Sequence, residues 1–150
     1  MNPRNSIVSC ISNIECSLYF KSHIGKPQSV QKVIVADFQN KVIGSLSKAL
    51  PNIIWETEFS PSTTKRDSID IYGHGNDFVV AIELDKNRAD QVAKKFVSRI
   101  ALLPNTKIYF ISLCYPGTDK MNKSECIKYF GYCSDLAARM GNDYAGFVVE

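Results

Sequence analysis

Three carboxylates with the spacing of a metal site lie in the middle of the chain, at Asp70, Glu83 and Asp85. They belong to two short, mostly apolar runs that a polar segment separates. Because side chains of a strand alternate between its faces, Glu83 and Asp85 share one face of the second run. Two neighbouring acids on an apolar strand are unfavourable unless something compensates their charge. Hard divalent ions such as Mg²⁺ bind carboxylate oxygens, so this spacing predicts a metal site.

The segment between the two runs predicts a β-hairpin. Residues 72–77 (YGHGND) contain two glycines and an Asn-Asp pair, which suit a short turn. We therefore expect residues 69–72 to pair antiparallel with residues 78–84. Asp70 then comes within cross-strand or diagonal reach of Glu83, and we predict that their carboxylates lie within about 6 Å of each other.

At these residues the chain resembles the PD-(D/E)XK nuclease superfamily, which has the restriction-endonuclease-like fold. The family has an acid in one strand, then Glu or Asp, any residue and Lys at the end of the next strand, followed by a helix. Asp70 and Glu83 match the two acids, and Asp85 stands where the family has its lysine. The resemblance covers about residues 30–113 in the order α-β-β-β-α-β. It implies a three-layer α/β fold with a mixed central sheet flanked by helices.

The resemblance implies a metal-dependent endonuclease that hydrolyses phosphodiester bonds of DNA. Asp70, Glu83 and Asp85 are then the catalytic residues, and they would bind Mg²⁺, or Mn²⁺, together with the Leu84 carbonyl oxygen. Because Asp85 replaces the family's lysine, three interpretations stay open: a second metal, a lysine from elsewhere, or an inactive site. The alternative function is a non-catalytic module on the same fold that binds nucleic acid or a protein.

Further acids could extend this cluster. Residues 52–59 predict a strand in which Glu56 and Glu58 share a face, and Glu58 is our candidate for a further metal ligand. An exposed polar strand face is the alternative. Asp37, in a helix predicted over residues 30–50, is a candidate by position, and a solvated carboxylate is the simpler interpretation there. Asp67 is a weaker candidate, because it cannot share a strand face with Asp70.

Basic side chains surround the acids in the sequence. A helix predicted over residues 88–103 has basic residues along one side, and a polar connector before the acidic strand holds two more. Our candidates for contacts with nucleic-acid phosphates are Lys65, Arg66, Lys86, Arg88, Lys95 and Arg99. An ordinary solvated surface is the alternative. Lys86 and Lys95 are also the candidates for the lysine that the motif lacks.

Length and composition predict one domain. The chain has 150 residues, is 45% hydrophobic and carries a net charge of +3, which is compatible with nucleic acid as a partner. We expect a helical extension over residues 1–28, with its helix at about 5–21, before the nuclease-like core. Residues 119–150 predict a helix, with Ile127, Phe130 and Leu136 facing inward, and a final strand. The extension could fill the core or form a subunit contact, so a homodimer stays open.

The cysteines and the hydropathy bear on the cellular environment. The five cysteines form no CxxC pair, which favours reduced thiols in a cytoplasm over a structural zinc site. The sequence has no run of about 18 apolar residues, so we expect no membrane span. We also find no secretory signal at the N-terminus.

Overall fold

A computed structural model describes residues 2–20, 23–64, 67–86, 88–115 and 122–149 of the chain. The helices are α1 (Pro3–Ser12), α2 (Ser17–Phe20), α3 (Gln28–Ala49), α4 (Ala89–Leu102) and α5 (Lys123–Arg139). The strands are β1 (Ile54–Phe59), β2 (Ile69–His74), β3 (Phe78–Lys86), β4 (Lys107–Tyr115) and β5 (Asp143–Val148).

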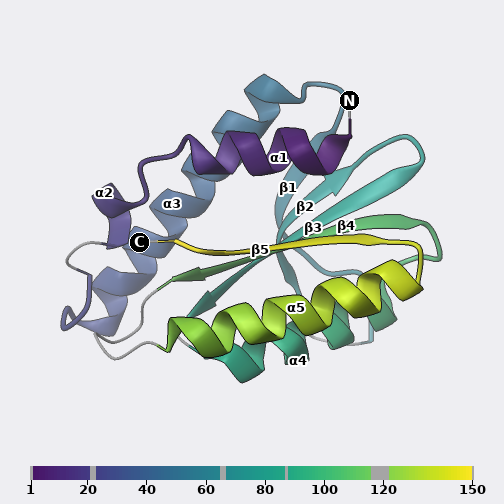
Figure 1. Cartoon of the computed structure of the whole chain (residues 1–150). Helices are drawn as coiled ribbons and strands as arrows, with labels where there is room; N and C mark the ends of the chain where they lie inside the picture. The colour runs from purple at the N-terminus through teal and green to yellow at the C-terminus, as the bar shows by residue number, and fades with distance from the viewer. Residues whose placement is uncertain (1, 21–22, 65–66, 87, 116–121, 150) are drawn as a thin grey trace.

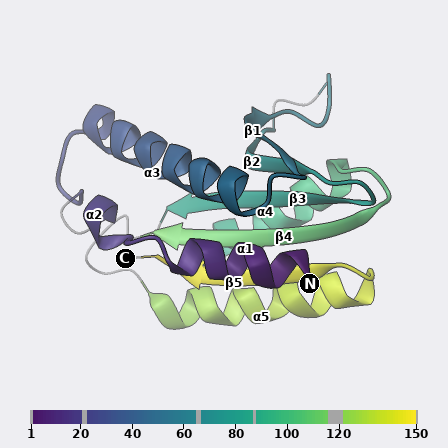
Figure 2. The ribbon, with the colours of Figure 1, turned by 90° about the horizontal axis from the view of Figure 1, so that it is seen from above.

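The strands form one mixed open sheet in the order β1-β2-β3-β4-β5. Antiparallel pairing joins β1, β2 and β3, and parallel pairing joins β3, β4 and β5. Figure 1 shows α1, α2 and α3 on one face of the sheet and α4 and α5 on the other. Seen from above, α3 lies toward the β1–β2 side and α1 toward β5 (Figure 2). The α/β class is confirmed, and the order α3-β1-β2-β3-α4-β4 is the one that the sequence predicts.

Each face of the sheet has its own apolar core. On the α3 side, Phe38 packs with Val80 and Ile82 of β3. On the α4 side, Phe96 packs with Ala81 and with Phe110 of β4. Because helices cover both faces, β3 is buried along most of its length instead of alternating between buried and exposed residues. Glu83 and Asp85, the acids of β3, are therefore placed in an apolar interior.

The N-terminal segment fills the core on the α3 side. We expected one helix over residues 5–21, but the chain forms α1 and α2 with a turn between them. Ile7 and Ile11 of α1 and Phe20 of α2 are each at most 2% exposed. The turn lets Phe20 reach Phe38 of α3, with ring centroids 4.9 Å apart. A single straight helix presents only one stripe and could not place both groups in the core.

The hairpin joins β2 and β3 in the expected antiparallel arrangement, but its strands are longer than predicted. Tyr72 pairs with Ala81, and the turn is confined to residues 75–77. Gly73 lies within β2, not in the turn. A side chain is excluded at this position because a Cβ would be 2.7 Å from the ring of Trp55 on β1. This glycine therefore makes room for an aromatic ring instead of forming the turn.

The inward face of α5 differs from the predicted one. Ile127 is 62% exposed and Leu136 is 42% exposed, so both predictions were wrong, whereas Phe130 is buried. The buried side chains of α5 are Cys126, Phe130, Cys133 and Ala137. Small thiol and methyl groups let α5 approach the sheet closely. Phe130 lies so close to Gly146 of β5 that any Cβ at Gly146 would overlap its ring.

Candidate functional site

The hairpin brings the predicted carboxylates together. The register of β2 and β3 places Asp70 opposite Glu83, and the Asp70 carboxylate is close enough to raise the pKa of Glu83. Asp70 Oδ2 also accepts a hydrogen bond from the backbone N–H of Leu84 at 2.7 Å. Asp85 follows on the same face of β3. The three acids thus share the face of the sheet that α4 covers.

Two basic side chains of α4 reach this carboxylate cluster (Asp70, Glu83 and Asp85). Lys95 Nζ lies 3.0 Å from Asp85 Oδ1 and 3.7 Å from Glu83 Oε2. It also donates a hydrogen bond to the Leu84 carbonyl oxygen at 3.0 Å. Arg99 Nε donates to Glu83 Oε1 at 2.9 Å. The two bases are four residues apart on α4, so they point to the same side of the helix.

We expected Lys95 and Arg99 to face nucleic-acid phosphates. In the structure both side chains instead contact the acids of the carboxylate cluster. Their side chains are 24% and 12% exposed. Arg99 Nη1 also contacts Asp67 Oδ1 at 3.3 Å, so Asp67, the weaker ligand candidate, joins the site through this arginine. The charged side of α4 faces the sheet because the acids of β2 and β3 compensate it there.

Glu83 and Asp85 are almost completely buried, at 0% and 1% exposure. Glu83 Oε2 and both carboxylate oxygens of Asp85 have no hydrogen-bond partner among the described residues. Asp85 Oδ1 is nevertheless in an ion pair with Lys95 at 3.0 Å. Buried charge without hydrogen bonds is unfavourable. These oxygens have the capacity to bind a proton or a further cation.

Burial and ion contacts shift the protonation of the cluster. Burial, and after it the Asp70 carboxylate, raises the pKa of Glu83 to about 9, although Lys95 and Arg99 act in the opposite direction. Burial also raises the pKa of Asp85, and Lys95 partly offsets it. Burial lowers the pKa of Lys95, but the neighbouring acids outweigh it and the net pKa is raised. The raised pKa of Glu83 favours its protonated form beside the Lys95 ammonium.

The donor atoms suit a hard metal ion, but they are not yet arranged around one. The carboxylate oxygens of Glu83 and Asp85 are the type of ligand that Mg²⁺ and Mn²⁺ prefer. Within the described ranges, no group of three or more His, Cys, Asp or Glu side chains is placed to hold an ion. Lys95 contacts the Leu84 carbonyl oxygen and Asp85, two of the predicted ligands. Ion binding there requires the Lys95 ammonium to change partners.

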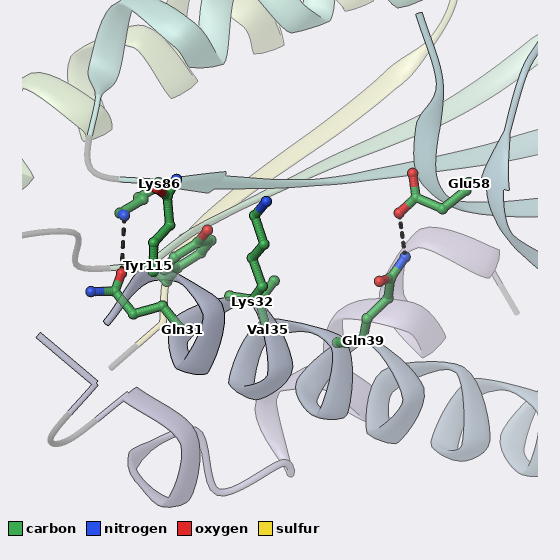
Figure 3. A pocket seen from close by; sticks show the side chains of 9 residues that line it. Gln31, Lys32, Val35, Gln39, Glu58, Lys86 and Tyr115 are labelled. Atoms are coloured by element: carbon green, nitrogen blue, oxygen red, sulfur yellow. Dashed lines mark hydrogen bonds between the residues drawn. The ribbon is translucent and has the colours of Figure 1, made fainter. Parts of the chain in front are cut away.

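Glu58, our candidate for a further ligand, contacts α3 instead of the cluster. Its Oε1 accepts a hydrogen bond from Gln39 Nε2 at 3.2 Å (Figure 3), and its Oε2 accepts one from Ser68 Oγ at 3.1 Å. Glu58 has a φ of 51°, in the left-handed region that non-glycine residues rarely adopt. This conformation interrupts the regular alternation of β1, on which the predicted orientation of Glu58 depended.

Gln39 is a site residue that the sequence analysis missed. It is 9% exposed on α3, and its Nε2 also donates to the carbonyl oxygen of Asp70. Gln39 thereby ties α3 to the strand that carries the first acid. Asp37, the acid that we considered on the same helix, is exposed. The available signal was an amide next to the apolar stripe of Phe38 and Val42.

A cavity of about 360 Å³ opens between α3 and the ends of β3 and β4. Its lining residues are Gln28, Gln31, Lys32, Val35, Ala36, Gln39, Glu58, Lys86 and Tyr115. Figure 3 shows Lys86 and Tyr115 at one end and Gln39 and Glu58 at the other, with Lys32 pointing from α3 toward the sheet between them. Lys86 lies here because it alternates with Asp85 along β3 and faces away from the cluster.

The remaining candidates lie apart from the cluster. Arg88 pairs with Asp90 at 2.8 Å, and both side chains are exposed. Glu56 pairs with His74 at 2.7 Å, also in an exposed position. Lys65 and Arg66 fall outside the described residues.

Comparisons with known proteins assign no family. The chain matches no family model, and no curated protein is significantly similar to it. Of the helices in the described ranges, none combines the length and the apolar character needed to cross a membrane. The function is therefore argued from the geometry of the site.

Proposed function

We propose that the chain is a metal-dependent nuclease of the restriction-endonuclease-like fold that hydrolyses phosphodiester bonds in DNA. The observation that carries this proposal is the position of Lys95, whose ammonium lies 3.0 Å from Asp85 and 3.7 Å from Glu83. The resemblance requires a lysine beside the two acids, and Asp85 occupies its usual position in the sequence. In this proposal α4 supplies that lysine. The order α3-β1-β2-β3-α4-β4 supports the fold assignment.

The side chains divide into ion-binding groups and a positioning cation. Asp70, Glu83 and Asp85, with the Leu84 carbonyl oxygen, are the groups that would hold Mg²⁺ or Mn²⁺. The ion would activate water and neutralise charge on the phosphate. Glu83 must release its proton for this, because burial keeps its pKa at about 9. Lys95, at 24% side-chain exposure, remains able to orient water or to stabilise negative charge on the phosphate.

A second function is supported by the ion contacts of α4. Lys95 and Arg99 already compensate the acids without any added ion. This arrangement fits a non-catalytic module, in which the cluster fastens α4 to the sheet and binding of nucleic acid or a protein takes place elsewhere. The two functions differ in whether a divalent ion can displace the Lys95 ammonium from Asp85.

Metal binding and DNA cleavage separate the two functions. Mn²⁺ binding is measured by calorimetry, and cleavage with labelled single- and double-stranded DNA and RNA, with Mg²⁺ and with Mn²⁺. Wild type is expected to bind Mn²⁺ and cleave DNA. Asp70→Asn should lower cleavage at least about 100-fold, whereas the control Asp37→Asn, an exposed acid of α3, should leave it unchanged. A folded wild type that binds no Mn²⁺ at millimolar concentration contradicts the nuclease and favours the binding module.

A further inference from the structure

We propose that the cavity between α3 and the ends of β3 and β4 is a subsite for one nucleotide of a single strand, with a phosphate held between Lys32 and Lys86. The inference deepens the proposed function, and it rests on it in taking the carboxylate cluster as the place of cleavage. The nucleotide in the cavity is then a neighbour of the phosphodiester that is hydrolysed.

The cavity and the carboxylate cluster lie on opposite faces of the sheet, and two cavity residues, Gln39 and Lys86, connect to residues of the cluster. At one end, Gln39 lines the cavity and donates to the carbonyl oxygen of Asp70. At the other end, Lys86 is the residue that follows Asp85 in β3. Tyr115, which also lines the cavity, has its pKa raised to about 12 by burial, and Lys95 and Asp70 are among the charges that act on it. A strand bound in the cavity therefore reaches the cluster by passing around the ends of β3 and β4.

The cation pair of the cavity suits a phosphate. Lys86 Nζ donates to Gln31 Oε1 at 3.0 Å, and Gln31 Nε2 donates to the Lys26 carbonyl oxygen at 2.9 Å. This chain of contacts fixes Lys86 at the mouth of the cavity. Lys32 has no hydrogen bond or ion pair within the described ranges, and it points toward the same space (Figure 3). Two lysines at one cavity favour an anionic ligand such as a phosphodiester.

The other end of the cavity offers groups for a base. Glu58 presents carboxylate oxygens that accept hydrogen bonds, and Gln39 presents an amide. Base edges carry the complementary amino and imino donors. One acid at the end opposite Lys86 leaves the lining with net positive charge. The lining is thus polarised, with cations for a phosphate and an acceptor for a donor group.

The size of the cavity suits one nucleotide. Pockets for small molecules and cofactors span about 300–1,000 Å³, and this cavity, at about 360 Å³, is near the lower limit. A base pair with both backbones is far larger, so one nucleotide of a single strand is the occupant that we propose.

Binding without metal tests the subsite apart from catalysis. Anisotropy of a labelled single-stranded DNA 12-mer in EDTA gives Kd for wild type, Lys32→Gln and Lys86→Gln. The matched control is Lys41→Gln, on the same helix but lining a different groove. Each cavity variant should raise Kd roughly tenfold and lower the salt slope by about 0.7, and the control should stay within about twofold. An equal loss in Lys41→Gln would indicate diffuse electrostatics and overturn the subsite.

Competition identifies the ligand class. A deoxynucleoside monophosphate should displace the 12-mer at a lower concentration than inorganic phosphate, and a duplex should bind more weakly than the single strand. Inorganic phosphate that competes equally well would reduce the cavity to an anion site, and equal duplex binding would contradict single-strand selection.

The two proposals fail in different ways. If wild type never cleaves DNA with Mn²⁺ but Lys32→Gln and Lys86→Gln lose binding in EDTA, the nucleotide subsite stands and the nuclease is wrong. If wild type cleaves and both cavity variants bind and cleave as wild type does, the nuclease stands and the subsite is wrong.

Discussion

The ammonium of Lys95 lies 3.0 Å from Oδ1 of Asp85, at the end of β3. Asp85 is 1% exposed, so its charge has little access to water. The contact therefore compensates a buried carboxylate and ties α4 to the sheet. The same lysine also donates to the Leu84 carbonyl oxygen, so one side chain contacts two of the groups that we propose as metal ligands.

Replacing Lys95 by Met should destabilise the metal-free protein by about 3 kcal/mol, because it leaves the buried Asp85 without its nearest cation. Urea unfolding at neutral pH measures the change. The matched control is Lys94→Met, next to it on α4 and exposed, where we expect a change within about 0.5 kcal/mol. Equal effects of the two substitutions would show that the ion contact adds no stability.

Replacing Asp85 by Lys should not simply restore the family motif, because it places a second ammonium beside Lys95. We expect a destabilisation of about 3 kcal/mol or more from two adjacent buried cations. The double variant Asp85→Lys/Lys95→Gln should recover part of that loss, with a coupling of at least about 1 kcal/mol in a double-mutant cycle. Additive unfolding free energies would contradict a direct contact. Cleavage by the double variant would show that a lysine at either position serves the proposed reaction.

Glu83 should make the metal-free protein less stable as the pH rises. Its pKa in the folded chain is about 9, compared with an ordinary value of 4.5. Between these values the folded state keeps a proton that the unfolded state has lost, so the free energy of unfolding falls with increasing pH. The contribution of Glu83 to the free energy of unfolding is present in full below about pH 4.5 and is lost as the pH rises to about 9. Glu83→Gln should make the melting temperature depend less on pH between about pH 5 and pH 9. If the melting temperature of this variant falls with pH as steeply as that of wild type, a protonated Glu83 is contradicted.

Glycine should be tolerated better than alanine at position 58. The φ of 51° at Glu58 is unfavourable for any residue with a Cβ, so Glu58→Gly should be about 1 kcal/mol more stable than Glu58→Ala. Both variants lose the same contacts with Gln39 and Ser68, which cancel in the comparison. Glu56 on the same strand is the control, since its φ is not positive. There alanine should be the more stable substitution, and the same order at both positions would contradict the strain.

The sequence by itself determined the parts of the fold that depend on short stretches of chain. Turn-forming residues at 75–77 and strand alternation bring Asp70 and Glu83 together, because both effects act within one hairpin. The long amphipathic stretches predicted α3 and α4 to within a few residues. The N-terminal helix was less predictable, because its break between α1 and α2 serves contacts with α3.

Only the tertiary structure decided which partners the site residues have. The sequence pattern of the basic side of α4 is the same whether that side faces solvent or acids. Packing of α4 against β3 brings Lys95 and Arg99 into contact with the carboxylate cluster. The positive φ of Glu58 broke the alternation that placed it with the acids. Gln39 meets Asp70 across 31 positions of the chain, and no local pattern encodes such a contact. Periodicity fixes which face a residue occupies, whereas the partner on that face depends on how distant elements pack.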